Sequence, residues 1–92
     1  MSKITLSGHI EVPSEDLNEV LAELPNHIAL THQEAGCITF SVTRDSSNPQ
    51  RFDVYEEFTD KVAFEKHQTR VKASHWGKVT KNVERFYTIS EA

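Results

Sequence analysis

Hydrophobic and polar residues alternate in four separate stretches of the chain. These stretches cover residues 3–12, 37–43, 51–59 and 83–90. Because successive side chains of a pleated strand point to opposite faces, an alternation with a period of two indicates a β-strand. The pattern therefore predicts four strands, and the turn-forming residues Asp45 to Pro49 join the second and third of them in a hairpin.

The segment between the first two predicted strands has the spacing of a helix. Its apolar residues recur three or four positions apart, at Leu17, Val20, Leu21 and Leu24. Ser14, which follows Pro13, is expected to cap the start of this helix with its side chain, and Gly36 to end the helical region. Pro25 either kinks the helix or opens a second one, because proline has no amide hydrogen to donate.

A second helix is predicted between the third and fourth strands. Asp60 is suited to cap its N-terminus, and Gly77 is expected to interrupt it. One face of this helix carries Phe64, His67, Val71 and His75. A histidine on an otherwise apolar face needs a polar partner, because burying an unpaired polar group costs free energy. His67 is therefore the first candidate for a functional residue.

The predicted order of elements is βαββαβ, which is the order of a ferredoxin-like α+β fold. Two interleaved right-handed βαβ units give a four-stranded antiparallel sheet with both helices on one face. We expect residues 1–92 to form one such domain, since a chain of 92 residues has room for a single core. The other face of the sheet is left bare, so we expect a second subunit to cover it in a homodimer.

Charge and composition exclude several classes of partner. The chain has 10 Lys and Arg against 14 Asp and Glu, a net charge of -4, and no basic stripe, so nucleic acid is not an expected partner. A membrane is not expected either, because no apolar run approaches the roughly 20 residues of a spanning helix. The single cysteine, Cys37, is expected to be a small buried hydrophobic residue, and the N-terminus lacks a secretory signal. We therefore expect a cytoplasmic protein.

Four segments of the sequence together are similar to one known family. They are Glu34-Ala-Gly-Cys-Ile, the stretch from Asp45 to Phe52, Val54-Tyr-Glu-Glu-Phe-Thr-Asp60 and Ala63-Phe-Glu-Lys-His67. In this order and spacing they resemble the antibiotic biosynthesis monooxygenase (ABM) family. The resemblance implies a dimeric α+β barrel of two ferredoxin-like domains, each with a pocket between its sheet and helices. For some members it also implies oxygenation of phenols or quinols without a cofactor.

His67 matches the family's pocket histidine, and we expect it to be the catalytic base. Oxygenation without a metal or flavin requires a deprotonated substrate, because the electron-rich anion can give an electron to O2. A neutral imidazole is suited to take the proton that the substrate must lose. The alternative is a structural histidine in the core, bonded to a backbone carbonyl or to a side chain of the third strand.

Four aromatic residues are expected to shape the pocket around this histidine. Tyr55 and Trp76 offer flat walls on which an aromatic ring can stack, and core packing is the alternative for both. Phe64 completes the pocket. His75 lies about 12 Å beyond His67 if the helix is continuous, so it is expected at the pocket mouth.

Glu56 is the remaining residue expected to bind substrate, because it shares a strand face with the apolar residues Phe52 and Val54. Its carboxylate could hold His67 in a productive tautomer. It could equally pair with Arg85 across the sheet as a structural ion pair, and this second interpretation is the one we favour.

No metal or other cofactor is expected. The five histidines and one cysteine form neither a helical i, i+4 pair nor a C-x-x-C motif, and no glycine-rich phosphate loop is present. The sequence thus favours a small oxygenase that acts on an aromatic or quinol-type compound. A dimeric ABM domain that only binds a small aromatic metabolite is one alternative. Haem binding or degradation is another, although Gly8 stands where haem-cleaving relatives have an Asn on the first strand.

Overall fold

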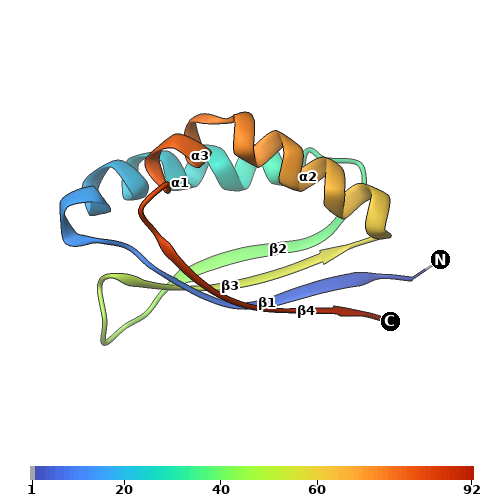
Figure 1. Cartoon of the computed structure of the whole chain (residues 1–92), viewed down its shortest axis with the longest axis horizontal. Coiled ribbons are helices and arrows are strands. Elements are labelled where there is room, and N and C mark those ends of the chain that lie inside the picture. The colour runs from blue at the N-terminus through green and yellow to red at the C-terminus, as the bar shows by residue number, and fades with distance from the viewer. Residues whose placement is uncertain (1) are drawn as a thin grey trace.

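The computed structural model describes residues 2–92 and has the predicted α+β architecture. Its elements are β1 (Ile4–Glu11), the 3-10 turn η1 (Ser14–Asp16), α1 (Leu17–His32), β2 (Cys37–Arg44), β3 (Arg51–Phe58), α2 (Lys61–Ala73), α3 (His75–Val79) and β4 (Glu84–Glu91). All three α-helices lie over one face of the sheet, and the other face is left open (Figure 1). Within residues 2–92, no helix is long and apolar enough to cross a membrane.

The sheet has the strand order β2-β3-β1-β4, and each neighbouring pair is antiparallel. β1 lies inside the sheet, where Gly8 is opposite Val54 of β3 and Tyr87 of β4. Because side chains alternate along every strand, this register decides which residues face the helices. It confirms the predicted four-stranded antiparallel sheet with its helices on one face.

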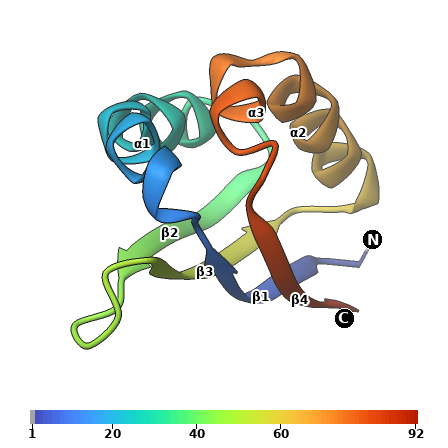
Figure 2. The ribbon, with the colours of Figure 1, turned by 60° about the vertical axis from the view of Figure 1, so that its left-hand side comes forward.

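Figure 2 shows the helices and the sheet as two layers, and the hydrophobic core lies between them. The sheet and the segments that adjoin it supply its larger part, and α1 and α3 supply the rest. The buried members are Leu6, Ile10, Val12, Val20, Phe52, Val54, Trp76, Val79 and Val83. Trp76 therefore packs in the core, which the sequence analysis gave as the alternative to a role in substrate binding.

The first helix departs from its prediction at both ends. Ser14 lies in η1 and makes no capping hydrogen bond, so the predicted side-chain cap is wrong. α1 then continues through Pro25 to His32 and ends before Gly36, so no second helix opens at the proline. A proline removes one helical hydrogen bond, and the burial of residues on both sides of it, Val20 and Thr31, favours a single continuous helix.

The second helix begins as predicted but ends earlier. The Asp60 side chain accepts a hydrogen bond from the Ala63 amide at 2.8 Å, which confirms the N-cap. α2 ends at Ala73, and the Ser74 hydroxyl accepts a bond from the Gly77 amide at 3.3 Å to start α3. The interruption predicted at Gly77 therefore lies at Ser74. Gly77 is inside α3, where a Cβ would lie 2.5 Å from the Val71 carbonyl oxygen.

Candidate functional site

A cavity of about 440 Å³ lies between the helices and the sheet, and we call it the central cavity. Five elements besides β1 contribute to its wall, so it depends on the whole fold rather than on one motif. The lining residues are Leu6, His27, Glu56, His67, Gln68, Val71, Lys72, Trp76, Gly77, Arg85 and Tyr87. Three residues predicted from the sequence, Glu56, His67 and Trp76, are among them.

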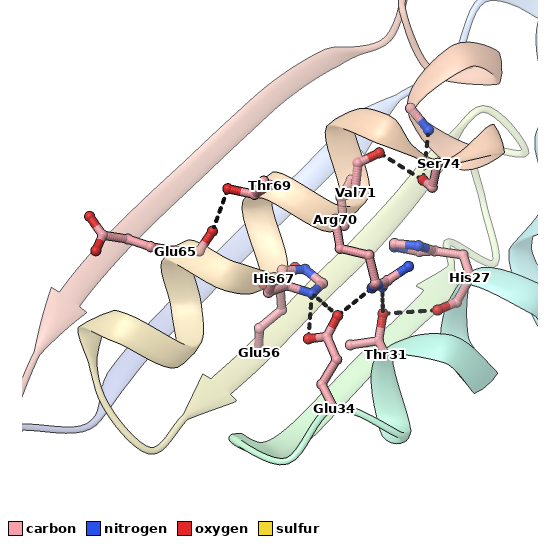
Figure 3. A network of polar contacts seen from close by, with 11 residues as sticks. His27, Thr31, Glu34, Glu56, Glu65, His67, Thr69, Arg70, Val71 and Ser74 are labelled. Carbon is pink, nitrogen blue, oxygen red and sulfur yellow. Dashed lines mark hydrogen bonds and ion pairs between the residues drawn. The ribbon is translucent and has the colours of Figure 1, made fainter.

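His67 projects from α2 toward the core and is only 3 % exposed. Its Nδ1 lies 2.9 Å from Oε1 of Glu34 (Figure 3). Because a carboxylate can only accept a hydrogen bond, Nδ1 carries the proton, and Nε2 of the neutral ring is left with its lone pair. Burial lowers the pKa of His67, and the neighbouring Glu34 carboxylate opposes this shift. The ring is therefore neutral at physiological pH, with Nε2 free to take a proton.

Glu34 is held by a network that joins α1 to α2. The Arg70 guanidinium donates to Glu34 through Nε and to the Thr31 hydroxyl through Nη2, the second at 2.9 Å. Thr31 in turn donates to the His27 carbonyl oxygen at 2.8 Å (Figure 3). Sequence reasoning gave Glu34 no role, although it lies in one of the family-like segments. The sequence analysis missed Arg70 as well. Arg70 follows His67 by three residues on the same helix, and this spacing was the signal that could have identified it.

Glu56 projects from β3 toward the helices and is 6 % exposed. Its Oε1 is buried without a hydrogen-bond partner and lies 3.8 Å from Nε2 of His67. Burial, with a smaller effect of the Glu34 charge, raises the pKa of Glu56 to about 7. This carboxyl can therefore hold or release a proton near neutral pH, next to the unprotonated nitrogen of His67.

The ion pair that we favoured between Glu56 and Arg85 is absent from residues 2–92. Arg85 donates instead to the Thr80 hydroxyl at 3.1 Å and to the Thr80 and Val83 carbonyl oxygens at 3.3 and 3.2 Å. These acceptors lie in the chain just before β4, so the guanidinium turns back along its own strand. Glu56 lies beside His67 but makes no hydrogen bond to it, and the bond from Nδ1 to Glu34 sets the tautomer instead, so the contacts of Glu56 match neither interpretation.

His27 is a site residue that the sequence analysis did not assign. Its ring stacks on Trp76 with centroids 4.4 Å apart and an angle of 3° between the planes. The residue is 4 % exposed, and its Nδ1 is buried without a partner. Burial lowers the pKa of His27 to about 3, and positive charge on His67 and Arg70 acts in the same direction. The signal in the sequence was its position, three residues after Leu24 on the apolar stripe of α1.

The other predicted pocket residues lie outside the central cavity. Tyr55 is on the opposite face of β3, where its hydroxyl donates to Glu57 at 2.8 Å. Phe64 packs edge-on against Phe58, with centroids 5.7 Å apart. His75 is exposed at the start of α3. The chain thus brings Glu56, His67 and Trp76 together and leaves Tyr55, Phe64 and His75 outside the cavity.

Within residues 2–92, no group of three or more His, Cys, Asp or Glu side chains is placed to hold a metal ion. Cys37 is half-buried, not fully buried as expected. Burial and the charges of Glu34 and Glu56 raise the pKa of its thiol, which keeps it protonated and unreactive at neutral pH.

Comparison with known proteins finds one family model that matches the chain and many solved structures with a similar fold. The family model described as Antibiotic biosynthesis monooxygenase matches residues 3–79. Comparison with curated proteins found no match. A solved structure named antibiotic biosynthesis monooxygenase is 20% identical with a TM-score of 0.72, covering 100% of this chain and 96% of the other.

Two solved structures from named organisms are also similar in fold. A conserved protein of unknown function from Bacteroides thetaiotaomicron, described as a possible oxidoreductase, is 18% identical with a TM-score of 0.76, covering 99% of this chain and 98% of the other. A conserved protein from Methanosarcina mazei is 21% identical with a TM-score of 0.71, covering 100% and 92%. At these identities the likenesses establish the fold and not the reaction.

Proposed function

Because the chain belongs to the antibiotic biosynthesis monooxygenase family, we propose that it oxygenates a small aromatic or quinol-type compound in the central cavity. The observation that carries the proposal is the neutral imidazole of His67, whose lone pair on Nε2 lies beside a buried carboxyl group in the cavity wall. A base of this kind is what a reaction without metal or flavin needs.

In the proposed reaction, Nε2 of His67 takes the hydroxyl proton of the substrate. The resulting anion gives one electron to O2, and the superoxide and substrate radical combine to form a carbon–oxygen bond. The peroxide takes back the proton from His67, and loss of water then breaks the O–O bond and a substrate C–H bond. One oxygen atom remains in the product as a carbonyl, and the other leaves in water, so no external reductant is needed.

Two carboxylates support the proton transfer. Glu34 bonds to Nδ1 and stabilises the imidazolium that forms when Nε2 is protonated. Glu56, with a pKa of about 7, can accept the proton or hold it next to Nε2. Trp76 provides a flat aromatic surface in the same wall, although His27 covers one of its faces.

Oxygen consumption tests this proposal. Wild-type protein is mixed with a panel of reduced aromatics, for example menadiol and dithranol, and the rate in buffer alone is subtracted. For a substrate that the wild type oxidises, His67→Ala should lower the rate about 100-fold or more, the usual contribution of a positioned base. His75→Ala is the matched control, because this exposed histidine lies outside the cavity, and it should keep the wild-type rate.

Two results would contradict the proposal in different ways. Uptake that survives His67→Ala removes His67 as the base. Binding of the same compounds without any uptake indicates a domain that only binds aromatic metabolites.

We also propose that two copies pair through the open face of the sheet. This face carries the exposed aromatic rings of Tyr55 and Phe86, which are 38% and 45% exposed. Uncharged residues such as Ser7 and Ser41 lie on it, together with the ion pairs of Glu57 with Lys3 and of Asp53 with Arg51. A second copy of the same face would cover these rings. The resemblance to the family implies this pairing. A reducing cytoplasm would keep the free thiol of Cys37 reduced, and this is the location that we propose.

A further inference from the structure

Two cations line the central cavity without a carboxylate partner. Lys72 of α2 and Arg85 of β4 are both in its wall. Neither takes part in any ion pair within residues 2–92. Arg85 donates to oxygens of Thr80 and Val83 and also interacts with the Tyr87 hydroxyl, all of which are uncharged at neutral pH.

The acidic groups near the cavity do not balance these two charges. Glu34 is already paired with Arg70. Glu56 is about half protonated at neutral pH, because burial raises its pKa to about 7. The rings of His27 and His67 are neutral. The cavity therefore has a surplus of positive charge, which favours a negatively charged ligand.

Two buried polar atoms in the cavity wall also lack partners. They are Nδ1 of His27 and Oε1 of Glu56, from side chains that are more than nine-tenths buried. Buried polar groups in folded proteins are nearly always hydrogen-bonded, so orphaned atoms in a cavity indicate groups that a ligand completes. A hydroxyl group suits both atoms, since it donates one hydrogen bond and accepts others. The remaining lining includes Leu6, Val71 and Tyr87, which suit an apolar ring.

We infer that the ligand of the central cavity is a hydroxylated aromatic acid with its carboxylate directed to Arg85 and Lys72. Its hydroxyl is directed to the part of the wall formed by His67, Glu56 and His27, where Nε2 of His67 takes its proton. The inference rests on the proposed function only in taking this cavity as the substrate site. It adds a requirement for an anionic group that the proton transfer to His67 does not need. Neutral quinols would accordingly bind more weakly than their carboxylated analogues.

A pair of matched, slowly oxidised ligands tests the inference. 1-Hydroxy-2-naphthoate and 1-naphthol share a ring and a hydroxyl group and differ by one carboxylate. Binding is followed by NMR through the indole N–H signal of Trp76, the only tryptophan in the chain. The acid should bind at least about tenfold more tightly, since a charge-assisted hydrogen bond corresponds to tenfold or more in affinity.

Variants then assign the preference to residues. Arg85→Gln and Lys72→Met should each weaken binding of the acid several-fold and leave binding of 1-naphthol unchanged. The Lys72 side chain is exposed and makes no ion pair among residues 2–92, so Lys72→Met should fold and keeps the test valid if Arg85→Gln does not. Lys81→Met removes the same charge from an exposed residue outside the cavity and should change neither affinity.

Equal binding of the two ligands overturns the inference, as does a preference for the acid that survives both cavity variants. Failure of both ligands to bind overturns it as well. The outcome is separate from that of the oxygen-uptake experiment. Uptake with a neutral quinol that depends on His67, without any preference for the acid, leaves the proposed function in place and removes this inference alone.

Discussion

At the scale of single residues, Glu56 and Glu57 are neighbours on β3 with opposite electrostatic environments. Glu56 faces the helices and has a pKa raised to about 7 by burial. Glu57 faces the open side of the sheet, where hydrogen bonds from Lys3, Thr39 and Tyr55 lower its pKa to about 2. Alternation along the strand produces this contrast, because adjacent side chains point to opposite faces.

This contrast predicts opposite effects of pH on two matched variants. The native state holds the Glu56 proton more tightly than the unfolded chain, so wild-type stability falls as pH rises from about 4.5 to about 7. Glu56→Gln removes this loss, and its stability relative to wild type should rise by up to roughly 3 kcal/mol between pH 4 and pH 8. Urea unfolding at a series of pH values measures the change.

Glu57→Gln should behave in the reverse sense. Its lowered pKa stabilises the native state above about pH 4.5, and this contribution is lost as pH falls toward 2. The variant should therefore be less stable than wild type at pH 7, and the difference should shrink in acid. Parallel pH profiles for the two glutamine variants would contradict the assignment of the two faces.

At the scale of elements, the Glu34, His67 and Arg70 side chains join the end of α1 to α2. Glu34→Gln should lower the free energy of unfolding by about 1–3 kcal/mol, the usual cost of breaking partly buried hydrogen bonds to charged groups. It should also lower the pKa of His67, because the Glu34 carboxylate raises it in the native protein. Urea unfolding gives the first quantity and an NMR titration of His67 gives the second.

Glu23→Gln serves as the control for this network. Glu23 accepts a hydrogen bond from Asn26 at 2.8 Å on the exposed side of α1, where such a surface contact contributes roughly 0–1 kcal/mol. A loss of stability as large as that of Glu34→Gln would show that the helix-joining network has no special weight. An unchanged His67 pKa in Glu34→Gln would show that Glu34 does not control the base.

Gly8 is the residue that lets β4 lie close to β1. Its φ angle is +151°, and a Cβ at this position would be 1.9 Å from the Phe86 carbonyl oxygen. Gly8→Ala should therefore cost more than about 2 kcal/mol in thermal or urea unfolding, while Ser7→Ala on the same strand should cost little. The same contact leaves no room for an Asn at this position, the residue found in haem-cleaving relatives. If the Gly8→Ala variant were as stable as the wild type, this explanation of Gly8 would be wrong.

At the scale of the whole molecule, the open face of the sheet is the surface through which we propose that two copies pair. The helices cover only the opposite face (Figures 1 and 2). Light scattering after size-exclusion chromatography should give about 21 kDa, twice the 10.5 kDa of one chain. Ser7→Lys places a charge on this face of β1, which lies inside the sheet, and should shift the protein to a monomer, because two copies would bring the lysines together.

Gln33→Lys supplies the control for the dimer. Gln33 follows α1 on the helical side of the molecule, so this variant should keep the mass of the wild type. A wild-type monomer at micromolar concentration would contradict the pairing. So would a dimer that tolerates Ser7→Lys.

The amino-acid sequence by itself determined the order and type of the main elements. Alternation marked all four strands, and the Asp60 cap located the start of α2, because both signals depend on residues close together in the chain. The same local signal placed His67 and Glu56 on inward faces. The family-like segments then identified the family, since they cover much of the chain in a fixed order.

Only the tertiary structure decided which inward residues meet. The stack of His27 on Trp76 and the bond from His67 to Glu34 depend on how α1, α2 and α3 are placed over the sheet. The absence of a Glu56 pair with Arg85 depends on how β4 joins the sheet and on the Thr80 oxygens before it. These contacts join residues far apart in the sequence. Periodicity states which face a side chain occupies, and it carries no information on the partner across the core, because that partner is set by strand register and by where each helix breaks.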